Sequence, residues 1–153
     1  MKILVSDDVS EKGVELLRQH GYEVDVKTNL DEQGLIDCIG EYDGMVTRSM
    51  THVTAKVIAA GKKLKVIGRA GVGVDSIDIK AATARGIIVV NAPTANTIAA
   101  TEHTCAMIMA ITRHIPQAHN SLMAGEWDRE RFTGIQLQNK TIGIIGVGRI
   151  GSR

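Results

Sequence analysis

The chain has 153 residues, of which 44% are hydrophobic and 23% are charged. This length corresponds to one domain, or to one domain and part of another. A formal net charge of +1 gives no reason to expect a nucleic acid or a membrane surface as a partner.

Two cysteines, Cys38 and Cys105, have no further cysteine or histidine at metal-ligand spacing, so we expect reduced core thiols and no metal site. The first apolar run, Ile3–Val5, is too short for a signal peptide. No run reaches the ~20 apolar residues of a membrane helix. These features together predict a cytoplasmic protein.

In chain order, five apolar runs of strand length alternate with helical segments. The runs are Ile3–Val5, Tyr22–Val26, Gly44–Thr47, Lys65–Gly68 and Ile87–Val90. Buried strands that alternate with helices are typical of a parallel sheet covered by helices. Residues 1–90 therefore predict a doubly wound, flavodoxin-like α/β domain.

Cap residues and glycines mark where the helices of this domain begin and end. Helices are expected after Ser10, Asn29, Thr54 and Asp78. Asn29 and Glu32 have the spacing of a capping box. Glycines that stop three of the helices stand at Gly21, Gly61 and Gly86.

The segment Asn91–Thr97 interrupts the alternation with a proline and small polar residues, and it is interpreted as a hinge or linker. One long helix is expected over Ile98–Met123, kinked at Pro116. The apolar run Thr141–Gly146 is expected to form a further buried strand.

Residues 146–151 read GVGRIG, which places glycines at the three positions of a G-x-G-x-x-G motif. In a dinucleotide fingerprint, Gly146 allows the tight turn, Gly148 lets the backbone approach the pyrophosphate and Gly151 lets the helix pack on the strand. The acidic ribose ligand expected about 20 residues later lies past Arg153, so the motif does not distinguish NAD from NADP. An ordinary glycine-rich turn is the alternative.

Two arginines follow predicted strands. Arg48 comes directly after Gly44–Thr47, and Arg69 comes directly after Lys65–Gly68. If these strands are neighbours, ~5 Å apart, two guanidinium groups reach one anion at the ligand-binding edge of the sheet. Glycines at 71 and 73 favour a turn whose N–H groups hold a carboxylate. The alternative is a pair of surface arginines that are bound to acids.

Essentially all 153 residues resemble the D-2-hydroxyacid dehydrogenase family. The segments that carry the resemblance are Arg48–Ile58, Gly68–Ile87 and Asn91–Ile115. The resemblance implies a substrate-binding lid domain followed by the start of a Rossmann NAD-binding domain. The implied boundaries are 1–90 for the lid, 91–97 for the hinge and 98–153 for the long helix with the first strand and glycine turn.

The resemblance also implies which residues contact ligands. Substrate-contacting positions are Arg48, Ser49, Arg69, Gly71, Val72, Gly73 and Asn96. Cofactor-facing positions are Val72, Gly146, Gly148, Arg149, Ile150 and Gly151. Arginine at both 48 and 69 is most similar to the branch that acts on 3-phosphoglycerate, a small phosphorylated 2-hydroxy acid.

The catalytic arginine, histidine and carboxylate of this family come from a later part of the nucleotide domain and have no counterpart here. We therefore expect an NAD-dependent enzyme whose catalytic residues lie beyond this chain, and no activity from the 153 residues alone. The counterpart of the long helix packs against a second subunit, which implies a homodimer or larger assembly. The single tryptophan, Trp127, is expected at an interface.

Two other functions are alternatives to this one. Ile3–Asp8 resembles the start of a phosphoacceptor receiver domain, but Arg48 stands where that fold needs an aspartate. A non-enzymatic relative that senses a dinucleotide or binds a small anion is the other alternative. Each histidine of the long helix is expected to be structural or exposed, because none has a partnering carboxylate at a strand end.

Overall fold

The computed structural model describes residues 1–153, which divide into two compact units, Met1–Ala95 and Asn96–Arg153. The division falls inside the segment Asn91–Thr97, where Pro93–Asn96 form turns.

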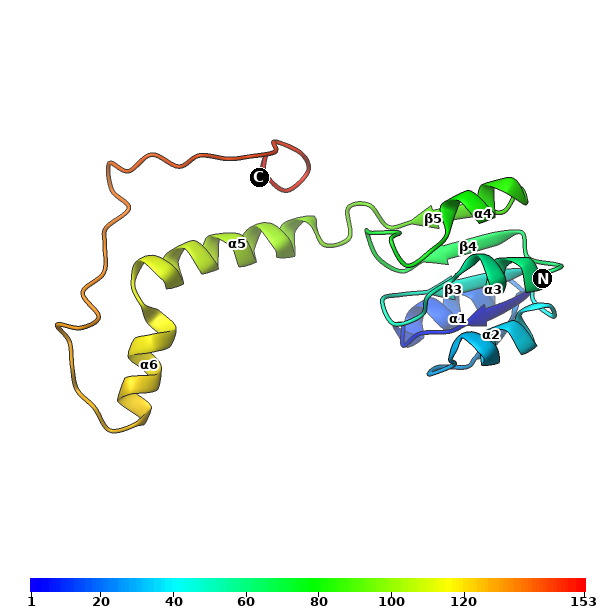
Figure 1. Cartoon of the computed structure of the whole chain (residues 1–153), viewed down its shortest axis with the longest axis horizontal. Helices are drawn as coiled ribbons and strands as arrows, with labels where there is room; N and C mark the ends of the chain where they lie inside the picture. The colour runs from blue at the N-terminus through cyan, green and yellow to red at the C-terminus, as the bar shows by residue number, and fades with distance from the viewer. The chain divides into compact units, whose positions relative to one another are not determined.

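The first unit is built on one five-stranded sheet (Figure 1). The strands are β1 (Lys2–Val5), β2 (Glu23–Val26), β3 (Gly44–Thr47), β4 (Val66–Arg69) and β5 (Ile88–Asn91). The helices between them are α1 (Glu11–Gln19), α2 (Glu32–Ile39), α3 (Ala55–Ala60) and α4 (Ile79–Ala84). All four strand pairs are parallel and the order is β2-β1-β3-β4-β5, which confirms the predicted doubly wound fold.

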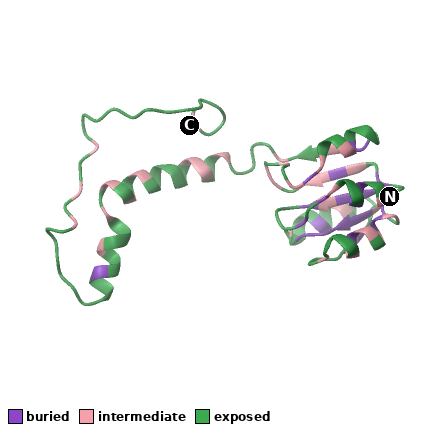
Figure 2. Cartoon of the chain, viewed as in Figure 1, coloured by how far each residue is buried: buried purple, intermediate pink, exposed green.

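Helices cover the two faces of the sheet unequally. On one face, α2, α3 and α4 pack on side chains such as Leu4, Met45 and Ile67, all fully buried. On the other face, α1 covers only the part that includes Ile3, Val5 and Val24. The outer strand β5 keeps Ile88 63% and Val90 50% exposed. The half of this face around β5 therefore offers apolar surface that the first unit does not cover, and Figure 2 shows β5 mostly as exposed.

The predicted caps are confirmed for α3 and α4. The Thr54 hydroxyl accepts from the Val57 N–H at 3.5 Å, and the Asp78 carboxylate accepts from the Ala81 N–H at 2.9 Å. Ser10 occupies the N-cap position of α1 but makes no side-chain cap hydrogen bond.

The predicted capping box at Asn29 and Glu32 is wrong. The residue that caps α2 is Asp31, whose side chain accepts from the Gly34 N–H at 2.8 Å. Asn29 instead adopts a left-handed conformation with φ 62°. Asparagine tolerates this region because its side chain satisfies local backbone groups, so it serves the turn that leads into the helix.

The second unit contains two helices where the sequence predicted one kinked helix. They are α5 (Thr97–Thr112) and α6 (Ile115–Met123), and His114 between them is left-handed with φ 51°. Pro116 lies in the first turn of α6, where its missing N–H costs nothing. The proline therefore begins a new helix instead of bending a continuous one.

No side chain of α5 is buried, although the helix is apolar. Large apolar residues that are exposed on α5 include Ile98, Met107, Met109 and Ile111, and Cys105 is also exposed rather than in a core as expected. A helix that is apolar on all sides needs a partner to cover it. Neither α5 nor any other helix combines the length and the apolar composition of a membrane span.

The strand predicted at Thr141–Gly146 is not present: these residues are irregular and exposed. A buried parallel strand depends on ladder hydrogen bonds to its neighbours, and the only sheet of the chain is complete within residues 2–91. Without a neighbouring strand, this apolar run lacks the hydrogen bonds that would keep it extended and the packing that would bury it.

Candidate functional site

The two predicted arginines stand at the carboxyl ends of neighbouring strands. Strands β3 and β4 are neighbours in the register Thr47↔Arg69, so Arg48 directly follows the position opposite Arg69. Arg69 Nη2 donates to Ser49 Oγ at 3.5 Å, which places a third predicted residue in the same cluster. Neither arginine takes part in any of the ion pairs of the chain.

Gly71 sets the conformation of the Arg69 side chain. A Cβ at position 71 would lie 3.0 Å from Arg69 Cζ and would collide with Nη1. The guanidinium group therefore occupies space that only glycine leaves open. Its Nε is buried and has no hydrogen-bond partner. A buried donor without a partner is uncommon and marks a position where a ligand is to be sought.

The turn after Arg69 is fixed to the end of β5. Asn91 Nδ2 donates to the Val72 carbonyl at 2.7 Å, and the Ala92 N–H donates to the Gly71 carbonyl at 2.9 Å. Sequence reasoning did not single out Asn91, because a side-chain amide at a strand end has no local pattern that reveals its partner. These bonds hold the turn from 71 to 73 beside Arg69.

Asp7 anchors the loop that carries Arg48 and Ser49. Its side chain is 5% exposed and accepts from Thr47 Oγ1 at 3.1 Å, from Thr51 Oγ1 at 2.9 Å, from the Thr51 N–H at 3.3 Å and from the Arg48 N–H. Burial alone would raise the pKa of Asp7, but the hydrogen bonds from Arg48 and the threonines outweigh it, so the pKa lies below its ordinary value.

The loops after β3 and β4 are also joined to each other. Val53 and Ile77 form an isolated parallel bridge. The Val53 N–H donates to the Ser76 carbonyl at 2.8 Å, and the Asp78 N–H donates to the Val53 carbonyl at 2.9 Å. The two segments that carry Arg48 and Arg69 are therefore tied at both their beginnings and their ends.

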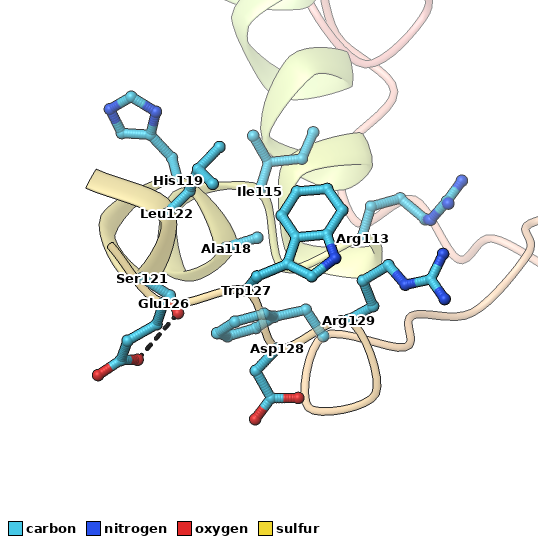
Figure 3. Close-up of a pocket in the computed structure, with 11 residues that line it drawn as sticks. Arg113, Ile115, Ala118, His119, Ser121, Leu122, Glu126, Trp127, Asp128 and Arg129 are labelled. Carbon is cyan, nitrogen blue, oxygen red and sulfur yellow. Dashed lines mark hydrogen bonds between the residues drawn. The ribbon is translucent and has the colours of Figure 1, made fainter. Parts of the chain in front are cut away.

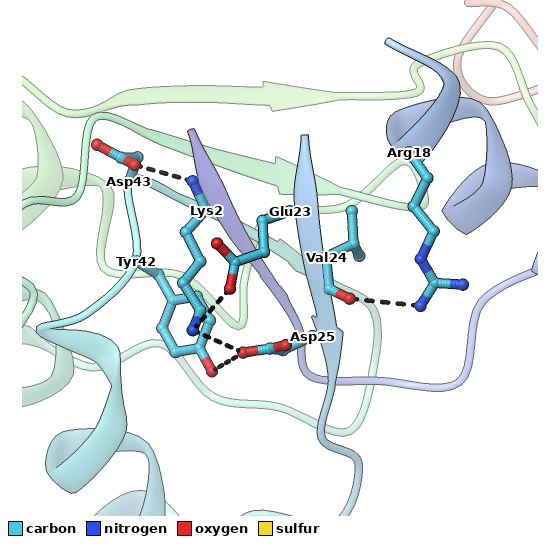
Figure 4. Close-up of polar contacts among 7 residues, drawn as sticks. All are labelled: Lys2, Arg18, Glu23, Val24, Asp25, Tyr42 and Asp43. Atoms are coloured by element: carbon cyan, nitrogen blue, oxygen red, sulfur yellow. Dashed lines mark hydrogen bonds and ion pairs between the residues drawn. The ribbon is translucent and has the colours of Figure 1, made fainter. Parts of the chain in front are cut away.

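A polar cluster lies at the opposite, amino edge of the sheet (Figure 4). Lys2 pairs with Glu23 at 3.1 Å and with Asp25 at 3.2 Å, and the Tyr42 hydroxyl donates to Asp25 at 2.9 Å. The hydrogen bonds from Tyr42 and then Lys2 hold the pKa of Asp25 below its ordinary value. Each charged group here has a partner, so this cluster fastens β1 to β2 and offers no free group to a ligand.

The remaining predicted residues lie in the second unit. Asn96 is the N-cap residue of α5 and makes no side-chain cap hydrogen bond. Gly146 has φ 92°, and a Cβ at Gly151 would collide with the Gly146 carbonyl oxygen. Arg149 and Ile150 belong to turns, not to a helix. The fingerprint thus forms a tight turn, without the predicted strand before it or the helix after it.

The second unit also has an open cavity of about 460 Å³ (Figure 3). Side chains that line it include Arg113, Leu122, Trp127, Arg129 and Phe132. Ser121 Oγ donates to Glu126 Oε2 at 3.0 Å beside it, and Trp127 is 75% exposed. The chain has no group of three or more histidine, cysteine or acidic side chains that suits a metal ion.

Known proteins are similar to this chain in sequence and in fold. Residues 3–146 match the family model of the D-isomer specific 2-hydroxyacid dehydrogenase catalytic domain. D-3-phosphoglycerate dehydrogenases from Synechocystis sp. and Methanocaldococcus jannaschii are each 53% identical to the chain, over 99% and 100% of its length. The chain spans 27% and 29% of the length of these two relatives.

A solved structure agrees with the sequence comparison. The crystal structure of cofactor (NAD+) bound 3-phosphoglycerate dehydrogenase from Entamoeba histolytica is 31% identical, with a TM-score of 0.78 over 99% of this chain and 48% of that one. The agreement of family model, identity and fold leads to one assignment. The chain belongs to the D-isomer specific 2-hydroxyacid dehydrogenase family.

Proposed function

We propose that the chain is the N-terminal portion of an NAD-dependent D-3-phosphoglycerate dehydrogenase, which oxidises 3-phosphoglycerate to 3-phosphohydroxypyruvate for serine biosynthesis. The observation that carries the proposal is the cluster of Arg48, Ser49 and Arg69 at the ends of two neighbouring strands. The two 53% identical relatives that bear this enzyme's name support the choice of substrate.

The cluster suits a substrate that has an anion at each end. Arginine binds phosphate and carboxylate through two parallel hydrogen bonds, so Arg48 and Arg69 are proposed to hold the two ends of 3-phosphoglycerate. The Gly71 N–H already donates to the Arg69 carbonyl at 2.8 Å, and we assign the N–H groups of Val72 and Gly73 to the substrate carboxylate. Ser49 and Asn96 are proposed as further polar contacts.

The dinucleotide is proposed to lie against Val72 and the glycine turn of residues 146–151. The positive φ of Gly146 and the close approach of Gly151 fit a turn that brings backbone N–H groups to a pyrophosphate. NAD, when bound, accepts the hydride from C2 of the substrate. NADP remains compatible with these residues, because the residue that contacts the ribose 2′ position lies outside them.

The domain roles follow from this assignment. Residues 1–90 are proposed as the substrate-binding lid, 91–97 as the hinge and 98–153 as the start of the nucleotide-binding domain. Closure about the hinge would exclude water and bring C2 to within about 3–3.5 Å of the nicotinamide. The residues that move the hydroxyl proton are proposed to lie outside this chain, so the 153 residues alone would not turn over substrate.

We also propose a cytoplasmic enzyme that is a homodimer or larger. The support for assembly is α5, an apolar helix with no buried side chain, since such a helix is stable only when a partner covers it.

The proposal is tested with the full-length enzyme and its Arg69→Ala variant, by following NADH formation from D-3-phosphoglycerate. The variant loses a charged hydrogen-bonding partner of the substrate, so its KM is expected to rise about 30-fold or more. Lys63→Ala removes an exposed cation that precedes β4 at the opposite edge and serves as the control. An unchanged KM in Arg69→Ala, or no NADH from the wild type, contradicts the proposal.

A further inference from the structure

Asp7 is not among the residues proposed to contact substrate or cofactor, yet its carboxylate accepts more hydrogen bonds than any other acid of the first unit. It lies two residues after the end of β1 and is 5% exposed, whereas its neighbour Asp8 is exposed. Four donors converge on its carboxylate, two hydroxyls and two backbone N–H groups. A buried acid with this many donors is held ionised by its surroundings.

All four donors belong to the five residues from Thr47 to Thr51. Asp7 Oδ2 accepts from the first two residues and from the last, and Oδ1 accepts from the Thr51 hydroxyl. Thr47 and Thr51 are both buried, while Met50 between them is 84% exposed. The Asp7 carboxylate therefore binds both ends of this loop, Thr47 and Thr51. The middle of the loop, which includes Arg48 and Ser49, faces solvent.

The Oδ2 position requires an acceptor, because two backbone N–H groups and a hydroxyl point to it, whereas Oδ1 meets only the Thr51 hydroxyl. An asparagine at position 7 has the same shape and can keep an acceptor at the Oδ2 position, but its NH2 group would force the Thr51 hydroxyl to accept instead of donate, and the negative charge would be lost. The bonds that remain would lose the strength that the charge gives them. The loop would then be held more weakly at both ends, although the fold around it would keep its apolar packing.

We propose that Asp7 is a positioning residue that holds the loop bearing Arg48 and Ser49 in the conformation that binds the anionic substrate. This inference rests on the proposed function for the identity of the substrate. Asp7 acts through the backbone of Arg48 and does not touch the substrate.

The sign of the effect separates positioning from simple electrostatics. Removal of a negative charge near an anion site would, by Coulomb attraction alone, tighten the binding of 3-phosphoglycerate. Loss of the loop conformation would weaken it. A higher KM in an uncharged variant is therefore a result that only positioning explains.

The test uses the full-length enzyme with Asp7→Asn, and with Asp8→Asn as the matched control. Asp7→Asn is expected to raise the KM for D-3-phosphoglycerate about tenfold, with less than about a twofold change in the KM for NAD. In an Arg48→Ala background the same change is expected to have a much smaller effect, because the group that Asp7 positions is gone. A general loss of folded enzyme would instead lower kcat and leave KM unchanged.

Thr51 provides a second route if Asp7→Asn does not fold. Thr51→Val removes one donor and keeps Asp7, and it is expected to raise the same KM, whereas Thr51→Ser keeps the hydroxyl and is expected to restore it. An unchanged KM for D-3-phosphoglycerate in both Asp7→Asn and Thr51→Val overturns the inference.

Limited trypsin digestion separates failure of this inference from failure of the proposed function. Cleavage after Arg48, identified by mass spectrometry, needs no substrate and reports whether the loop is held. It is expected to be about tenfold faster in Asp7→Asn than in Asp8→Asn, because local opening exposes the bond. Equal cleavage rates would show that Asp7 does not hold the loop, whatever the enzyme oxidises.

Discussion

At the scale of single residues, the two arginines of the site depend on neighbouring residues that fix their positions. Gly71 makes room for the Arg69 guanidinium, and Asp7 fixes the backbone of Arg48. The sequence predicted the arginines and the glycines because they stand directly after apolar runs. It could not predict Asp7 as an anchor, because its donors are about forty residues away in the chain, as the separation of 40 to Thr47 illustrates.

Gly71→Ala tests the steric argument at this scale. A methyl group at position 71 collides with the end of a flexible side chain, so the Arg69 guanidinium is expected to move while the free energy of unfolding changes by less than about 0.5 kcal/mol. The KM for D-3-phosphoglycerate is expected to rise about tenfold.

Gly68→Ala is the control, because a Cβ there makes only ordinary contacts of 3.8 Å or more. Steady-state kinetics and thermal unfolding of both variants check the prediction. Equal KM values in the two variants would show that the position of the guanidinium does not matter for binding.

The lowered pKa of Asp7 makes a prediction about acid stability. A carboxyl group whose folded-state pKa is below its ordinary value of 3.8 stabilises the fold above that pH, and the stabilisation is lost as the pH falls through the folded-state pKa. At neutral pH, Asp7→Asn is expected to lower the free energy of unfolding by about 2 kcal/mol. Urea unfolding at neutral pH and below pH 3.8 measures the difference, which should shrink in acid; a constant difference would rule out this linkage.

At the scale of elements, the sequence predicted what local chemistry decides. The five strands were found within one residue at each end, and Thr54 and Asp78 cap the helices they were expected to cap. The capping box at Asn29 failed because two residues of N-cap type, Asn29 and Asp31, stand close together. Only the backbone conformation of Asn29, with φ 62°, distinguishes them.

Two further failures have a different cause. The strand expected at Thr141–Gly146 needs neighbouring strands, and a local apolar pattern contains no information about whether neighbours exist. Pro116 was expected to kink one helix, but the chain changes direction already at His114, so the proline stands in a first turn. Pro116 therefore predicted where the helix is interrupted, but not that the interruption separates two helices.

Asp78→Ala tests the contribution of a cap. The Asp78 carboxylate satisfies the Ala81 N–H, which would otherwise lack a partner, so its loss is expected to cost about 1 kcal/mol of unfolding free energy. The bridge between Val53 and Ile77 ends at this residue, since the Asp78 N–H donates to Val53. Because that bond comes from the backbone, the substitution should not change the KM for substrate. Denaturant unfolding measures the stability and steady-state kinetics measure the KM. A variant as stable as the wild type would contradict the capping role.

At the scale of the whole molecule, the two units differ in how completely they bury their own apolar side chains. The first unit buries two cores on the faces of its sheet, and it contains the arginine cluster that is assigned to substrate. The second unit leaves α5 uncovered and the glycine turn without a strand. The sequence predicted the five strands of the first unit, but it also predicted a buried strand at Thr141–Gly146 that the second unit does not form.

The central claim is that the carboxyl edge of the sheet selects a phosphorylated 2-hydroxy acid. The most direct test compares kcat/KM of the full-length enzyme, with NAD, for D-3-phosphoglycerate and for D-glycerate, which lacks only the phosphate. Two arginines that are free of acidic partners predict a preference of about 100-fold or more for the phosphorylated acid, since each binds an anion through charged hydrogen bonds. Equal values for the two acids, or a preference for D-glycerate, would contradict the account.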